Sequence, residues 1–148
     1  MPEFTGVSHV ELTVRDADRS ASWYEQVLGM RRVADHAEDE HPTPGVLARV
    51  VNLRHRTSGL SIGLIRHKSG TDEAFSELRV GLDHLALSVA SREELEKWVE
   101  HLDGCGVTHS GISEHLVSDT GDHRWAVSVL VLRDPDNIQL ELFVLGAA

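Results

Sequence analysis

The chain has 148 residues, of which 24 are acidic and 14 basic, and its formal net charge is −10 at pH 7. The length fits one compact domain, 1–148, with a sizeable core. A nucleic-acid binder needs a basic face, and the sequence indicates none, because its few basic clusters are local and the chain as a whole is acidic. The sequence has no apolar run near 18 residues and no secretory pattern at its start, so we expect a cytoplasmic protein without a membrane partner. Because Cys105 is the one cysteine, no intrachain disulfide can form.

The first half of the chain predicts a strand, a helix and three further strands. Alternating apolar and polar residues predict a strand over 7–15, and Asp16 or Asp18 then begins a helix that Gly29 ends. The further expected elements are strands over 30–34, 46–53 and 60–66, an acidic loop over 35–45 as a candidate lid, and a turn at Ser58-Gly59.

The second half follows the same order after a polar linker over 68–80, which contains a possible helical turn. A strand over 82–89 leads to a helix that begins at the capping box Ser91-Arg92-Glu93-Glu94 and runs to Asp103. The remaining expected features are terminating glycines at 104 and 106, a short strand over 107–112, a polar loop over 113–123, a strand over 125–132, a tight turn over 134–137 and a last strand over 138–144.

The two halves also match residue by residue. A shift of 75 positions places segment 8–14 on segment 83–89, and a shift of 78 places segment 59–65 on segment 137–143. Such a fixed period means that one supersecondary unit is used twice. We therefore predict an α+β fold of two tandem βαβββ modules, at about 7–67 and 81–145, which form a cupped mixed β-sheet with the helices outside. The two helices each contribute a predicted core tryptophan, Trp23 and Trp98.

The polar faces of three predicted strands carry a candidate metal site. His9, His84 and Glu141 stand opposite the apolar residues of their strands, so a shared cup would be lined by two imidazoles and one carboxylate. This donor set suits a divalent transition metal that keeps open positions for other ligands. Three side chains of the same faces are candidates for a substrate pocket: Thr13, Ser88 and Phe143.

Three further side chains are candidates for catalytic proton transfer. Glu11 lies one step beyond His9 on the same face, and His67 lies further along the strand that contains Gly63. His123, and also His109, follow loops that could fold over the cup. A surface or lining role without chemistry remains the alternative for each of them.

These segments together resemble the vicinal oxygen chelate superfamily, the group of glyoxalases, bleomycin-resistance proteins and extradiol dioxygenases. The resemblance extends from Val7 to Val144 and is carried by segments 8–14, 23–30, 82–89 and 133–142. It implies paired βαβββ modules, a divalent metal, a small-molecule substrate that chelates the metal through neighbouring oxygens, and, by family habit, a homodimer. The positions that match the family's ligands are His9, Gly63, His84 and Glu141.

Gly63 departs from this pattern, because a glycine cannot bind a metal through a side chain. Members similar to glyoxalase I or methylmalonyl-CoA epimerase have Glu or Gln there, whereas three ligands remain in extradiol dioxygenases and fosfomycin-modifying enzymes. Neither of these subclasses fits fully. Residues 113–124 lack the potassium-binding loop and cationic pocket of fosfomycin thiol transferases, and residues 127–132 lack the tyrosine expected of an extradiol enzyme.

We therefore expect a metal-dependent enzyme and favour Fe(II) or Mn(II) with extradiol-type oxygenase chemistry, Zn(II) and Ni(II) remaining open. A non-redox lyase or isomerase, or a fosfomycin-type antibiotic-resistance enzyme, would use the same ligands. The alternative of another class is a binding protein that sequesters an antibiotic or metabolite, as the bleomycin-resistance members do. Such proteins line their cups with aromatics, and this chain has only three Trp, one Tyr and three Phe.

Overall fold

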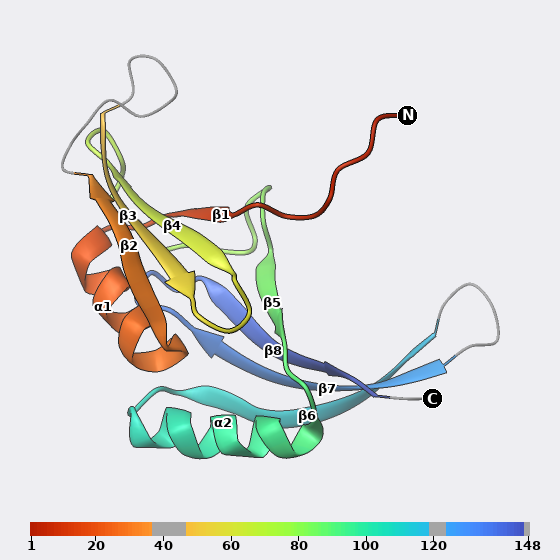
Figure 1. The fold of residues 1–148 in the computed structure, drawn as a ribbon. Coiled ribbons are helices and arrows are strands. Elements are labelled where there is room, and N and C mark those ends of the chain that lie inside the picture. The colour runs from red at the N-terminus through yellow and green to blue at the C-terminus, as the bar shows by residue number, and fades with distance from the viewer. Residues whose placement is uncertain (37–46, 119–123, 147–148) are drawn as a thin grey trace. The chain divides into compact units, whose positions relative to one another are not determined.

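The computed structural model describes residues 1–36, 47–118 and 124–146. The chain folds into two compact units, Met1–Ala74 (unit 1) and Phe75–Ala148 (unit 2), and their boundary falls inside the predicted linker. Each unit has the order βαβββ, which confirms the α+β fold with two tandem modules (Figure 1). Among the described residues, no helix is long and apolar enough to span a membrane.

Unit 1 contains a four-stranded mixed sheet with the strand order β1-β4-β3-β2. β1 runs parallel to β4, and the other neighbouring strands are antiparallel. The strands are β1 (Val10–Thr13), β2 (Met30–His36), β3 (Ala48–His55) and β4 (Ser61–His67).

Helix α1 (Ala17–Leu28) begins and ends where the sequence predicts. The carboxylate of Asp16 accepts the backbone N–H groups of Asp18 and Arg19, and Gly29 ends the helix in the left-handed conformation with φ 64°. The helix packs against β2, β3 and β4. The prediction that Trp23 is a core residue is wrong, because Trp23 is half-buried and its neighbour Tyr24 is the fully buried aromatic of this helix.

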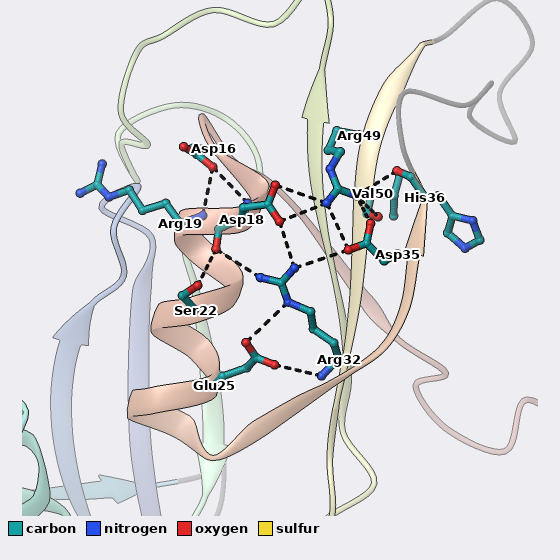
Figure 2. A network of polar contacts seen from close by, with 10 residues as sticks. All are labelled: Asp16, Asp18, Arg19, Ser22, Glu25, Arg32, Asp35, His36, Arg49 and Val50. Carbon is teal, nitrogen blue, oxygen red and sulfur yellow. Dashed lines mark hydrogen bonds and ion pairs between the residues drawn. The ribbon is translucent and has the colours of Figure 1, made fainter.

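Charged side chains connect this helix to the neighbouring strands. Figure 2 shows the carboxylate of Asp18 between two guanidinium groups, with Arg32 Nη1 at 3.0 Å and Arg49 Nη2 at 3.1 Å. Arg49 also binds Asp35, and this hydrogen bond lowers the pKa of Asp35 below its ordinary value. Because Glu25 accepts the backbone N–H of Arg32, both ends of α1 are joined to β2.

Unit 2 repeats this architecture with the strand order β5-β8-β7-β6, in which β5 and β8 are parallel. Helix α2 (Arg92–Gly104) packs against β6 and β8. Its cap is the predicted one, because the hydroxyl of Ser91 accepts the N–H of Glu94. The strands are β5 (His84–Ser88), β6 (His109–Ser118), β7 (Arg124–Arg133) and β8 (Gln139–Leu145).

Some details of unit 2 correct the sequence-based expectations. Gly104 lies inside α2 rather than after it, so that Cys105 is the capping residue and Gly106, with φ 68°, follows. Trp98 is half-buried rather than part of the core. The linker contains turns but no helix among its described residues 68–80.

Two predicted loops are shorter than expected because strands extend into them. Residues 113–118 continue β6 and pair with β7 from Ser113↔Val129 to Ser118↔Arg124, so backbone pairing overrides their polar sequence. In unit 1, Asp35 and His36 belong to β2. The rest of the candidate lid, residues 37–45, and the end of the second loop, residues 119–123, lie outside the described residues.

Candidate metal site

The first group of the candidate site is His84, at the start of β5. Its Nδ1 lies 2.7 Å from Oδ1 of Asp83, and its Nε2 lies 3.5 Å from Oε2 of Glu141 on β8. Because a carboxylate only accepts hydrogen bonds, Nδ1 carries a proton and donates it to Asp83, so Nε2 is the ring nitrogen that could bind a metal. The hydrogen bond to Asp83 raises the pKa of His84 above its ordinary value; partial burial opposes this rise, and the charge of Glu141 adds to it.

The alternation of β8 explains why Glu141 is available at this place. Leu140 and Leu142 are buried at 0% and 1% exposure, whereas Gln139, Glu141 and Phe143 point to the other face and are half-buried. The side chain of Glu141 is 17% exposed, so it is largely shielded yet reachable from solvent.

The pair formed by His84 and Glu141 fits a divalent transition metal. Two donors about 2.1 Å from a tetrahedral or octahedral ion lie about 3.0 to 3.4 Å from each other, which is close to the observed 3.5 Å. An imidazole with a carboxylate suits Fe, Mn, Ni or Zn. Across the part of the chain that the structure describes, no group of three or more His, Cys, Asp or Glu side chains is placed to hold a metal. The pair is therefore a partial ligand set, and a complete site needs further donors.

A series of polar contacts through Gln139, Arg133 and Glu77 leads to the carboxylate of Glu141. Gln139 Nε2 lies 3.5 Å from Oε1 of Glu141, and Gln139 Oε1 accepts Arg133 Nη2 at 2.9 Å. Arg133 is held in turn by both carboxylate oxygens of Glu77, at 2.7 and 3.1 Å. This ion pair lowers the pKa of Glu77 to about 2. The sequence reasoning missed all three supporting residues, although Gln139 shares the face of Glu141 and could have been found by the two-residue period of the strand.

Unit 1 contains a second pair of imidazole and carboxylate. His9 directly precedes β1, and its Nε2 lies 3.8 Å from Oε1 of Glu11. Both side chains are substantially exposed, at 56% and 40%. In the sheet register, Glu11 lies opposite Gly63 on β4, and Gly63 lies opposite Asn52 on β3.

The other predicted residues lie at further positions of the two units. Thr13 and Ser88 are exposed on the predicted faces of β1 and β5. His67 ends β4, four residues beyond Gly63, which is about 13 Å along a strand. His109 begins β6, its side chain is 12% exposed, and its Nε2 lies 3.1 Å from Oδ1 of Asp103. His123 lies outside the described residues.

Comparison with known proteins decides the family. Residues 6–142 match the sequence profile of the Glyoxalase/Bleomycin resistance protein/Dioxygenase superfamily. The chain belongs to this superfamily. The match confirms the resemblance that the histidine-bearing strands and the turn over 134–137 indicate in the sequence.

Individual members of the superfamily differ in how closely they resemble the chain. A glyoxylase/bleomycin resistance protein/dioxygenase domain from Frankia sp. EAN1pec is 33% identical, with a TM-score of 0.78 over 96% of this chain and 98% of that one. The fosfomycin resistance protein FosX from Listeria monocytogenes, solved with Mn(II) and sulfate, is 18% identical with a TM-score of 0.62 over 96% and 93% of the two chains, which supports the fold alone.

The putative ring-cleaving dioxygenase MhqA of Bacillus subtilis (strain 168) is 28% identical over 123 residues. The match covers 77% of this chain and 35% of MhqA. The chain thus corresponds to about a third of that relative's length.

Proposed function

We propose that the chain is a divalent-metal-dependent enzyme whose small substrate binds the metal through two neighbouring oxygens. His84 and Glu141 are the proposed ligands in unit 2, His9 keeps the ligand role that the sequence predicts for it, and Fe(II) or Mn(II) are the favoured ions. The single observation that carries the proposal is the placement of His84 between two carboxylates. Its Nδ1 lies 2.7 Å from Oδ1 of Asp83, and its Nε2 lies 3.5 Å from Oε2 of Glu141. A bound divalent ion would supply a Lewis acid that polarises the substrate oxygens.

The surrounding residues of unit 2 hold the two ligands in a binding geometry. Asp83 fixes the tautomer and the ring orientation of His84, as a carboxylate commonly does for a metal-bound histidine. Gln139 and Arg133 restrain Oε1 of Glu141, so that Oε2 is the oxygen that faces Nε2 of His84. An ordered pair of ligands loses less conformational entropy when the ion binds.

The substrate would lie on the same sheet faces as the ligands. The hydroxyl groups of Thr13 and Ser88 are proposed hydrogen-bonding partners of a small polar molecule, and the half-buried ring of Phe143 is its apolar contact. His67 is too far along β4 for direct proton transfer beside His9, so we propose no catalytic step for it. A homodimer is also expected from the habit of the family.

The experiment that tests this proposal is elemental analysis of protein purified without added metal. We expect about one equivalent of Fe, Mn, Ni or Zn per chain in the wild type, and loss of this metal in His84→Ala and Glu141→Ala. His115→Ala and Glu3→Gln are matched controls, because both side chains are exposed and neither is a proposed ligand. A folded wild type without metal that binds a drug or metabolite tightly would instead support a binding protein.

The reaction class is tested on the same samples. The similarity to MhqA makes ring cleavage one candidate, and it predicts oxygen consumption with a catechol. A lyase, isomerase or epoxide-opening enzyme would act on 2-oxoaldehydes or epoxides without consuming oxygen. Metal-loaded protein that is inactive on all three substrate classes would argue against the proposed chemistry.

A further inference from the structure

Positive charge is concentrated in one segment of unit 1, although the chain as a whole is acidic. Segment 41–71 has five basic residues and no Asp or Glu, whereas the complete chain has 24 acidic residues and a net charge of −10. The segment includes β3, the turn that follows it and β4. A basic side chain of this segment can therefore find a carboxylate only on another part of the chain.

Some arginines of unit 1 have such a partner, and others do not. Arg32 on β2 binds the carboxylate of Asp18 on α1. Among the described residues, by contrast, no carboxylate forms an ion pair with Arg31, Arg54 or Arg56, and all three arginines are exposed. Three guanidinium groups at one end of this sheet are thus left without a described counter-charge.

The register of the sheet places two of these arginines next to each other. Arg31 on β2 lies directly opposite Arg54 on β3, and Arg54 lies opposite Ser61 on β4. The adjacent residues Leu53 and Ile62 are buried, so the three polar side chains share the other face of the sheet. Residues directly opposite each other have Cβ atoms about 4.5 to 5.5 Å apart, and like charges in such a pair destabilise the sheet. The two arginines therefore repel each other at this place.

The third arginine lies in the short turn that follows β3. Arg56 is the first residue of this turn, whose ends are joined by two backbone hydrogen bonds. The N–H of His55 donates to the carbonyl of Leu60 at 2.8 Å, and the N–H of Gly59 donates to the carbonyl of His55 at 3.1 Å. Nη2 of Arg54 extends to the same turn and lies 3.9 Å from the place where a Cβ of Gly59 would be. Because the turn is already ordered, a ligand that binds there loses little free energy in fixing the backbone.

From these observations we infer that Arg31, Arg54 and Arg56 form a binding site for a dianionic oxyanion, such as the phosphate group of a small molecule. A guanidinium group donates two parallel hydrogen bonds to such a group, and the hydroxyl of Ser61 is a further donor on the same face. The bound dianion would neutralise the repulsion between the two opposed arginines. A nucleic acid does not fit, because the acidic remainder of the chain repels a long polyanion. The site lies wholly within unit 1 and does not depend on the proposed metal.

NMR titration of ¹⁵N-labelled protein tests this site with inorganic phosphate as the probe. Phosphate replaces chloride at constant ionic strength, and saturable shifts are expected at the amides of Arg31 and of residues 54–61. Arg31→Gln and Arg54→Gln should each weaken phosphate binding by about tenfold, as expected for the loss of one hydrogen bond to a charged group. Arg19→Gln is the matched control, because Arg19 is an exposed arginine in the first turn of α1. This control should bind phosphate like the wild type.

Three results would overturn the inference. The first is wild-type protein without saturable shifts, and the second is an equal loss of affinity in Arg19→Gln and Arg54→Gln, which would indicate diffuse attraction by net charge. The third is acetate, a monoanion, that binds as tightly as phosphate. Glycerol phosphate identifies the source of the ligand: tighter binding than inorganic phosphate indicates an organic phosphate, equal binding indicates free phosphate, and both results support the site.

Urea unfolding without phosphate gives a readout that a structural role of these arginines would change. Arg31→Gln removes one of two like charges, so the midpoint of unfolding should stay the same or rise. Added phosphate should raise the midpoint of the wild type more than that of Arg31→Gln, because a ligand that binds the folded state stabilises it. A midpoint that falls in Arg31→Gln without phosphate would mean that Arg31 stabilises the fold itself, and this result would overturn the inference.

Discussion

Replacing Asp83 with Asn should weaken metal binding by removing the group that orients His84. The carboxylate lies 2.7 Å from Nδ1 of His84, a distance typical of a charge-assisted hydrogen bond. Loss of such a partner weakens metal affinity by about 10- to 100-fold. Because the side chain of Asp83 is 66% exposed, solvent screening places the effect at the lower end. We expect about tenfold, or about 1.4 kcal/mol of binding free energy.

Isothermal titration with Mn(II) measures this affinity, and Asp72→Asn is the matched control, since Asp72 is an exposed aspartate that binds Arg66 and no proposed ligand. NMR titration of the apo protein gives a second readout, because Asp83 is the main cause of the raised pKa of His84. The pKa of His84 should therefore fall toward its ordinary value in Asp83→Asn. A variant that binds Mn(II) as tightly as the wild type, with an unchanged pKa of His84, would refute this reasoning.

Three further predictions concern the support of the site and the core of unit 2. Gln139→Leu should weaken Mn(II) binding by less than tenfold, because its 3.5 Å contact with Glu141 is long; a loss as large as that in Glu141→Ala would contradict this. Glu77→Gln should lower the urea midpoint of unfolding near neutral pH, because the ion pair with Arg133 depresses the pKa of Glu77 in the folded protein. The difference from the wild type should vanish as the pH falls from 4.5 toward 2, since protonation of Glu77 breaks the ion pair. A difference that persists at pH 2 would exclude this cause. Leu142→Ala should destabilise the protein by about 2 to 5 kcal/mol in urea unfolding, because Leu142 is 1% exposed; a cost below about 1 kcal/mol would mean that the core relaxes around it.

The repeat and the alternation of polar residues were sufficient to predict most of the fold. They placed two βαβββ modules, a first helix cap at Asp16 or Asp18, of which Asp16 is the cap, a second cap at Ser91, and the sheet faces that carry Glu11 and Glu141. These features depend on local spacing, which a single sequence contains. The extension of β6 through Ser118 was missed, because it depends on backbone pairing with a distant strand.

The candidate site was only partly predictable for the same reason. The residues His84 and Glu141 could be proposed from repeat positions, but their separation and the support from Glu77 and Arg133 depend on side-chain packing across strands. The surroundings of Gly63 could not be predicted from the sequence either. The sequence shows a missing ligand at Gly63, and only the structure shows that Cγ of Glu11 lies 3.0 Å from the place where a Cβ of residue 63 would be.

The most direct test of the central claim is anomalous scattering from crystals of the Mn(II)- or Zn(II)-loaded protein. The account predicts one strong peak within about 2 to 2.5 Å of both Nε2 of His84 and Oε2 of Glu141. A strong peak elsewhere, with these two atoms left in contact with each other or with solvent, would contradict the account.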